Sequence, residues 1–568
     1  MARLWLAATC AVALTVLACN AAEQGPRPLP RRWLFVMRSM SQPQNLKRTL
    51  ELLPRAKAAG YNALVLSDNG LMQPHSTDGY AESLRTLQRE AKKNGLDLIP
   101  CVMPIGYSGV IIGQDPNLAE GLPVKDALFV VSVGKATLVP DPAVTVSNGD
   151  LEKVQGDTFP GWSQENAGKS IFADHQVVHR GQTAVRMERI AEAEPKWGHC
   201  RFIQTVKVHP FRQYRLRAWV KTEKFSNPSR ARVLVLAPTD VERTLADIPI
   251  SQETQDWTGI DTAFNTLEWN EVRLYFGSWG GGEGKIWWDD ISLEEVGLVN
   301  VLRRAGTPLT VKSETGRVYK EGVDYEPIQD ARLAPWDKHY HVPPAITLTP
   351  GSAIQEGERL RVSYYHPVLI HEYSLMCCVS QPKLYHLLAK QIKWVNDVLH
   401  PDHFFMQHDE IRTMNWDDAC QRRKLTPGQL LADNARQCVQ IIKTISPKAK
   451  VWVWSDMFDP MHNAVKEYYL VNGPLTGSWE GLGKDVGIVN WAGHLEGKNA
   501  KFFADRGHEQ VLAGYYDGDE DGRGITRWLA NTKDVPRVTG AMYTTWQDKY
   551  DALAPWAKAA WGGAPRGN

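Results

Sequence analysis

The 568-residue sequence has no appreciable excess of either charge and contains few cysteines. Lysine and arginine total 65 against 64 for aspartate and glutamate, which excludes the broad basic surface that binds nucleic acids or anionic membranes. Of the eight cysteines, the six that follow the N-terminal segment show no metal-type CxxC spacing and are too sparse for a disulfide-dependent scaffold. We therefore expect a neutral substrate, no nucleic-acid partner, no metal site and no essential disulfide.

Long hydrophobic runs are also scarce. One apolar run, from Leu4 to Leu17, follows Arg3 and precedes small residues, a pattern typical of a secretory signal peptide over residues 1–22. No other stretch approaches the ~18 apolar residues of a membrane-spanning helix. Two forms of processing stay open: ordinary cleavage after residue 21 or 22, and lipoprotein processing that leaves Cys19 as the lipidated first residue. The sequence thus predicts export to a bacterial periplasm, cell surface or extracellular space.

The sequence does contain an alternation of short apolar strands with amphipathic helices, which is typical of parallel β/α units. Three strands are expected before the middle of the chain, over residues 33–37, 63–66 and 96–101. Five more are expected after Pro382, over residues 403–407, 450–454, 487–490, 510–515 and 538–544. Eight such strands predict an α/β fold, a (β/α)8 TIM barrel. An open doubly wound sheet is the alternative.

Between these two groups of strands the chain becomes β-rich, with turn signals and alternating runs. The opening at Asn148 and the closing run through Trp287 and Trp288 resemble jelly-roll carbohydrate-binding modules, and predict a β-sandwich inserted after the third barrel strand. In such a domain Trp162, Trp287 and Trp288 either stack on glycan or pack the core. The expected order is barrel, sandwich, β-rich connecting segment and barrel, over residues 23–140, 141–296, 297–366 and 367–568.

Polar and aromatic residues follow the predicted barrel strands, where (β/α)8 enzymes carry their reactive groups. The fourth strand is followed by His408 and the adjacent carboxylates Asp409 and Glu410. The other strand ends hold Arg38, Trp454, Trp491, Tyr515, Asp517, Trp546 and Asp548. Singly, each has a structural alternative, such as an ion pair for Arg38 or a core position for a tryptophan. Together they favour a sugar-binding pocket, which needs both carboxylates and aromatic walls.

The adjacency of the two carboxylates points to one form of glycoside hydrolysis. Neighbours in sequence cannot flank one glycosidic bond from opposite faces, as a nucleophile and an acid must. They suit the substrate-assisted reaction, in which the 2-acetamido oxygen of the sugar attacks the anomeric carbon. Asp409 would orient the acetamido group and stabilise the oxazolinium charge, and Glu410 would act as general acid and then as base.

The pattern resembles the glycoside hydrolase family 20 β-N-acetylhexosaminidases and their distant relatives, over nearly all of the barrel. The resemblance implies that Asp409, Glu410 and Tyr515 are catalytic, with Tyr515 bonding the acetamido oxygen. It implies substrate binding by Arg38, Trp454, Trp491, Asp517, Trp546 and Asp548. His408, which follows the fourth strand beside the carboxylate pair, is a further expected substrate-binding residue. The chain departs from the family at Gln407-His408, where relatives have two glycines, and at Asp548, where they have glutamate. The family's Pro-Gly-His element is not clear in Pro104-Ile105-Gly106-Tyr107.

The resulting hypothesis is an exo-β-N-acetylhexosaminidase that uses no cofactor and acts on glycans with terminal β-linked N-acetylhexosamine. The short Asp548 leaves room near an axial O4, which favours N-acetylgalactosamine over N-acetylglucosamine. Two alternatives stay open. One is another barrel glycosidase, including an endo-acting one, and the other is a non-catalytic glycan-binding lipoprotein whose β-sandwich does the binding.

Overall fold

The computed structural model describes residues 29–563 apart from 74–77, 194–195, 197, 240–242, 338, 372–373 and 496. The predicted signal peptide and Cys19 lie outside the described residues. Among the helices that are described, none has the length and apolar character needed to cross a membrane.

Eight parallel strands close into a barrel, which confirms the predicted (β/α)8 fold and excludes an open sheet. In barrel order they are β1 (Arg31–Met37), β2 (Ala63–Ser67), β3 (Asp97–Val102), β20 (His403–Met406), β22 (Lys450–Trp454), β24 (Gly487–Asn490), β25 (Gln510–Tyr515) and β26 (Val538–Thr544). Strand β1 pairs with both β2 and β26, and these two pairings complete the ring.

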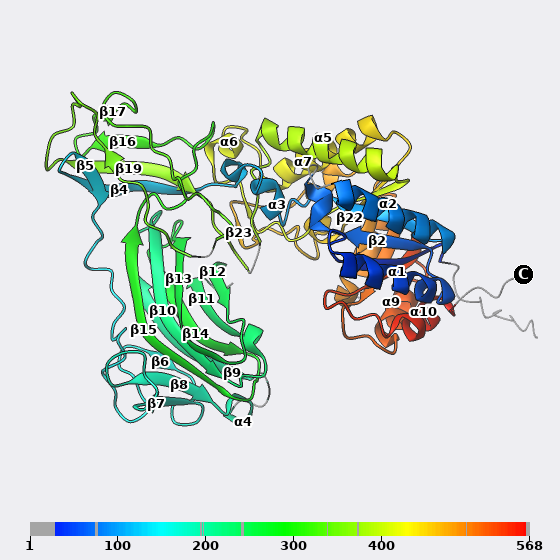
Figure 1. Cartoon of the computed structure of the whole chain (residues 1–568), viewed down its shortest axis with the longest axis horizontal. Coiled ribbons are helices and arrows are strands. Elements are labelled where there is room, and N and C mark those ends of the chain that lie inside the picture. Colours follow the sequence, from blue (N-terminus) through cyan, green and yellow to red (C-terminus); the bar gives the residue numbers. More distant parts are fainter. Residues whose placement is uncertain are drawn as a thin grey trace, which may run out of the picture.

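Amphipathic helices surround the barrel (Figure 1). The principal ones are α1 (Pro43–Ala58), α2 (Asp78–Lys93), α5 (Pro382–Leu399), α7 (Pro427–Ile445), α8 (Lys498–Asp505), α9 (Arg523–Asn531) and α10 (Leu553–Trp561). Local sequence sets their ends: α7 begins with a capping box between Thr426 and Gln429 and has proline in its first turn. Short helices α3 (Gly109–Ile112) and α6 (Asp418–Gln421) follow β3 and β20.

The interior of the barrel is filled by large side chains. Trp33, Phe35, Phe405, Trp452 and Trp454 belong to one buried cluster there, and the rings of Trp33 and Trp452 meet edge to face at 4.7 Å. A barrel filled in this way leaves space for a ligand only at its mouth.

The long insertion after β3 includes the predicted sandwich, at lower left in Figure 1. One sheet has the order β13–β10–β15–β8–β7 and the other β12–β11–β14–β9–β6. The bounds are β6 (Ser163–Gln164), β7 (Ile171–Asp174), β8 (Ala184–Glu188), β9 (His199–Lys207), β10 (Gln213–Glu223), β11 (Ala231–Ala237), β12 (Arg243–Pro249), β13 (Gln255–Asn265), β14 (Glu271–Trp279) and β15 (Lys285–Val296). Trp162, Trp287 and Trp288 are buried, and Trp162 stacks on Phe202 at 4.2 Å, so these indoles pack the domain instead of facing a glycan.

A separate six-stranded sheet connects the sandwich to the barrel. Its order is β17–β16–β19–β4–β5–β18. The bounds are β4 (Leu122–Ser132), β5 (Lys135–Leu138), β16 (Thr310–Ser313), β17 (Val318–Tyr319), β18 (Ile346–Thr347) and β19 (Arg359–His366). The sequence analysis grouped residues 122–138 with the barrel. In the structure they belong to the connecting sheet, because β4 pairs antiparallel with β19, the strand that returns toward the barrel.

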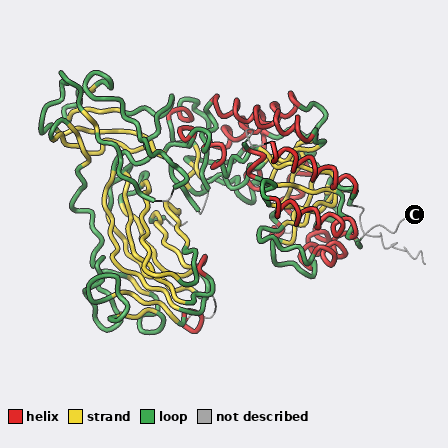
Figure 2. The backbone as a smooth tube through the Cα atoms, viewed as in Figure 1, coloured by secondary structure: helices red, strands yellow, loops and turns green. Residues whose placement is uncertain are grey.

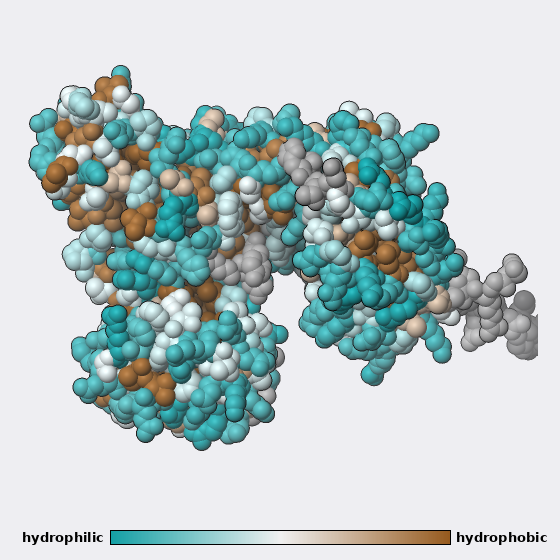
Figure 3. Space-filling view, viewed as in Figure 1, coloured by the Kyte–Doolittle hydropathy of each residue, from teal (hydrophilic) through white to brown (hydrophobic). Residues whose placement is uncertain are grey.

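The barrel and the insertion differ in secondary structure, and apolar side chains are unevenly distributed over the surface. Figure 2 shows helices concentrated around the barrel, with strands and loops dominating the insertion. The face in Figure 3 is mainly hydrophilic, with apolar side chains gathered near the six-stranded sheet. The exposed Val133, Val318, Val323 and Val342 belong to that sheet and its loops.

Candidate active site

A pocket of about 860 Å³ opens at the carboxyl ends of the barrel strands. This volume suits a small-molecule site, and the barrel mouth is where (β/α)8 enzymes place their chemistry. Its lining includes Asp409, Glu410, Trp454, Trp491 and Trp546 of the predicted residues, together with Tyr107, Tyr516 and Trp336. Trp336 comes from the connecting segment, so the insertion contributes to the rim.

Asp409 occupies a crowded acidic region of this pocket. Desolvation raises the pKa of Asp409, and the nearby negative charges of Asp456 and Glu410 raise it further. Asp409 is therefore suited to carry a proton at pH values where an exposed aspartate would be ionised.

Glu410 is held by two side chains that the sequence analysis did not identify. Its Oε1 lies 2.7 Å from a guanidinium nitrogen of Arg412, whose side chain is only 2% exposed. The hydroxyl of Tyr107 donates to Oε2, and Arg412 in turn donates to the Tyr107 oxygen at 3.1 Å. This triangle fixes the carboxylate, and Tyr107 is contributed by the loop after β3 in which no family element was recognised.

The backbone of Glu410 is equally constrained. Its φ of 51° lies in the left-handed region, and its N–H donates to Asp456 at 2.9 Å. Asp456 also accepts from Nε1 of Trp491 at 3.2 Å and from Asn463 at 2.8 Å. Burial raises the pKa of Asp456 to about 6 despite these hydrogen bonds, which lower it. Asp456 therefore positions both a carboxylate and an aromatic wall of the pocket.

A glycine brings the loop after β3 against this carboxylate pair. A Cβ added to Gly106 would lie 1.6 Å from the backbone oxygen of Asp409, so only glycine permits the approach. Ile105 donates its N–H to the backbone oxygen of Gln407 at 2.9 Å, which joins the same two loops.

The walls of the pocket are aromatic. Trp491 and Tyr516 stack with an interplanar angle of 19° and ring centroids 6.0 Å apart, and Trp546 is 39% exposed. Trp454 is almost completely buried, and its ring centroid lies 4.8 Å from that of Phe405 in the barrel interior. Its indole forms the floor of the pocket. Such surfaces match the apolar faces of sugar rings.

Tyr515, predicted to be catalytic, does not line this pocket. It packs between the barrel and its helices, stacked on Tyr543 at 4.1 Å, and Tyr516 takes the place facing the pocket. The reason is local: Tyr515, Tyr516 and Asp517 have φ values of 73°, 43° and 61°, so the in–out alternation of β25 ends at this point.

Four more predicted binding residues also lie outside the lining. Arg38 forms a 2.6 Å ion pair with Asp548, the structural alternative considered for it. Asp517 accepts the backbone N–H groups of Trp546 at 2.8 Å and Gln547 at 3.2 Å, so it holds the loop that carries Trp546.

His408, the fourth of these residues, points away from the pocket toward α7. Its Nε2 lies 3.1 Å from Oδ1 of Asn434 and donates to it. Burial lowers the pKa of His408 to about 4, so the ring is neutral at neutral pH.

Comparison with protein-family models and with curated proteins gave no match. Among solved structures, the chain is similar to one titled "CBM4 structure and function", at 14% identity and TM-score 0.20, over 26% of this chain and 99% of that one. It is also similar to the CBM22-1 xylan-binding domain from Paenibacillus barcinonensis, at 15% identity and TM-score 0.21, over 28% of this chain and 96% of that one. A third structure, TmCBM61 with β-1,4-galactotriose, gives 16% identity and TM-score 0.20, over 26% and 94% of the two chains.

Proposed function

We propose that the chain is a glycoside hydrolase that removes terminal β-linked N-acetylhexosamine. The observation that carries this proposal is the adjacent pair Asp409 and Glu410 in one pocket with the aromatic walls Trp491, Tyr516 and Trp546. Carboxylates supply acid–base chemistry, and aromatic faces bind a neutral sugar ring. The resemblance to family 20 hydrolases supports the same activity.

The proposed reaction is substrate-assisted. The acetamido oxygen attacks the anomeric carbon while the glycosidic C–O bond breaks and the leaving oxygen takes a proton from one carboxyl group. The same group, now a carboxylate, removes a proton from water, which attacks the anomeric carbon and reopens the oxazolinium ring. The second carboxylate balances the positive charge that develops on the acetamido group.

The geometry bears on which carboxylate donates the proton. The family resemblance gives this role to Glu410, but Arg412 is ion-paired with Glu410 while desolvation raises the pKa of Asp409. These charges support the reverse assignment, with Asp409 as acid and Glu410 as the counter-charge. The dependence of each variant on the leaving group distinguishes the two assignments.

The structure gives no basis for the preference for N-acetylgalactosamine. That preference required Asp548 near O4 of the sugar, whereas Asp548 is paired with Arg38 and Arg48 and does not line the pocket. The proposal therefore covers both N-acetylhexosamines.

A panel of four aryl glycosides tests the proposal: the β-N-acetylgalactosaminide, the β-N-acetylglucosaminide and the two corresponding plain hexosides. We expect hydrolysis only of the 2-acetamido substrates, and competitive inhibition by a thiazoline mimic of the bicyclic intermediate that is tighter than inhibition by the product sugar. Comparable hydrolysis of the plain hexosides, or a covalent glycosyl adduct on any side chain, would refute the substrate-assisted mechanism.

A further inference from the structure

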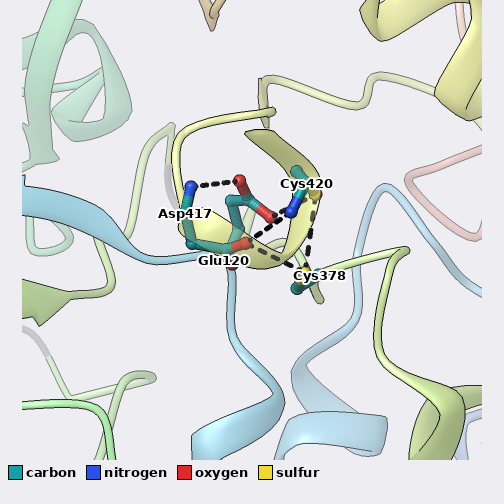
Figure 4. A group of neighbouring side chains, drawn as sticks. All are labelled: Glu120, Cys378, Asp417 and Cys420. Carbon is teal, nitrogen blue, oxygen red and sulfur yellow. Dashed lines mark hydrogen bonds between the residues drawn. The ribbon is translucent and has the colours of Figure 1, made fainter. Parts of the chain in front are cut away.

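Two thiols and two carboxylates meet in the buried region where the insertion leaves and rejoins the barrel (Figure 4). Glu120 lies just before β4, on the departing segment, and Cys378 lies just before α5, on the returning segment. Asp417 and Cys420 lie at the N-terminus of α6, in the loop after β20. The four residues, called here the Cys₂-carboxylate cluster, therefore join three segments that are far apart in the sequence.

The spacing of the cluster fits a tetrahedral ion. One ligand atom from each residue lies within 4.8 Å of all the others. The two sulfur atoms are 3.6 Å apart, Cys378 Sγ is 3.5 Å from Asp417 Oδ1, and Cys420 Sγ is 3.8 Å from Glu120 Oε2. With Zn–S bonds of about 2.3 Å and Zn–O bonds of about 2.0 Å, tetrahedral angles require about 3.8 Å between sulfurs and about 3.5 Å from sulfur to oxygen.

The charges of the cluster also favour a cation. All four residues are buried, and Asp417 is paired with Arg304 at 2.6 Å. The Arg304 guanidinium balances the charge of only one of the four acidic side chains of the cluster. Buried groups that are ionised need a partner of opposite charge. A divalent ion between the four ligand atoms would balance two more charges.

We propose that the Cys₂-carboxylate cluster binds a structural zinc ion. Thiolate ligands select zinc over magnesium or calcium, and four protein ligands leave no open position for a substrate. This site departs from the sequence expectation of no metal. The residue spacing gave no signal because only Asp417 and Cys420 are local to each other.

The ion would act on the candidate active site through the loop after β20. Glu120 accepts the backbone N–H of Trp416 at 2.7 Å, and the same loop carries Glu410 and Arg412. Zinc at the far end of this loop would fix the position of Arg412, and so of the carboxylate that it holds.

The test uses the full chain, purified without chelators and without metal-affinity resin. Elemental analysis is expected to find about one zinc per chain, retained in the Cys438→Ser control and lost in the Cys378→Ser/Cys420→Ser variant. Cys438 is a matched control because it is a buried thiol of α7 outside the cluster. A chelator should lower the melting temperature of the wild type and of the control, and leave that of the double variant unchanged.

A second measurement does not depend on the variant folding. Exchange of the wild-type ion for cobalt should give the intense visible bands of tetrahedral coordination and a thiolate-to-cobalt charge-transfer band. A wild-type protein that contains no stoichiometric metal and takes up no cobalt would overturn the proposal. So would a peptide crosslinked through Cys378 and Cys420, found by mass spectrometry without reduction, because the sulfurs would then be unable to bind zinc.

Discussion

His408 provides a test of whether a residue beside the carboxylate pair binds substrate or maintains the fold. Its pKa is lowered from 6.5 to about 4, mainly by desolvation, with the Asn434 hydrogen bond opposing the shift. Between these values the unfolded chain binds a proton that the folded protein does not, so stability falls as the pH drops below 6.5 and levels off near 4. Since one pKa unit corresponds to about 1.4 kcal/mol, His408 should contribute about 3 kcal/mol to this acid destabilisation.

The variant His408→Gln removes this titration and keeps a side-chain N–H that can reach Asn434. Urea unfolding, followed at several pH values from about 7.5 to about 4, should show that the variant loses about 3 kcal/mol less stability than the wild type. The exposed His386 of α5 supplies the control, and His386→Gln should follow the wild-type curve. Parallel curves for wild type and His408→Gln, together with a raised KM in the variant, would refute the structural role and restore the binding role that the sequence suggested.

Three further predictions concern the carboxylate pair and its supports. One of the variants Asp409→Asn and Glu410→Gln removes the proton donor, and it should slow the hydrolysis of substrates with poor leaving groups much more than that of activated aryl glycosides. The other variant should slow the hydrolysis of both kinds of substrate alike. Equal behaviour of the two variants would contradict distinct roles. Gly106→Ala should lower kcat/KM about 100-fold, because its Cβ forces the Asp409 carbonyl to move by roughly 2 Å. The control Gly79→Ala, with nothing within 4 Å of its Cβ, should match the wild type. Activity of Gly106→Ala within about tenfold of the wild type would contradict this account. Arg412→Met should lower the unfolding free energy by about 2 kcal/mol, and by less in the Glu410→Gln background. Additive effects in this double-mutant cycle would contradict a stabilising ion pair between Arg412 and Glu410.

The barrel and its insertion were predictable because their signals are local and repeated. Each barrel strand is a short apolar run, each helix has its own amphipathic period, and eight such units leave little choice of architecture. The same reasoning located the mouth of the barrel, since polar and aromatic residues follow strands there. Asp409, Glu410, Trp454, Trp491 and Trp546 were all found in this way and all line the pocket.

The remaining parts of the site depend on contacts that no local pattern records. Tyr107 and Arg412 are separated by 305 positions, and they meet only because the loops after β3 and β20 are neighbours in the ring. Tyr516 faces the pocket in place of Tyr515 because the left-handed backbone from Tyr515 to Asp517 interrupts the in–out alternation at the end of β25. Sequence spacing fixes neither the partner of a loop residue nor the direction of a side chain beyond the last regular residue.

The strand-end aspartates show that a carboxylate at the barrel mouth can serve the neighbouring backbone instead of a ligand. Strand ends leave backbone N–H groups that need acceptors, and a short carboxylate satisfies them well. Asp68 accepts from the N–H groups of Met40 and Gly70 after β2, Asp456 accepts from Glu410 after β22, and Asp517 accepts from Trp546 after β25. A carboxylate at a barrel mouth is therefore more informative when it lines the pocket, as Asp409 does, than when its oxygens serve the neighbouring backbone. Of these aspartates, Asp456 and Asp517 hold the aromatic walls Trp491 and Trp546 in place. The acid–base chemistry that we propose is therefore assigned to the pair after β20.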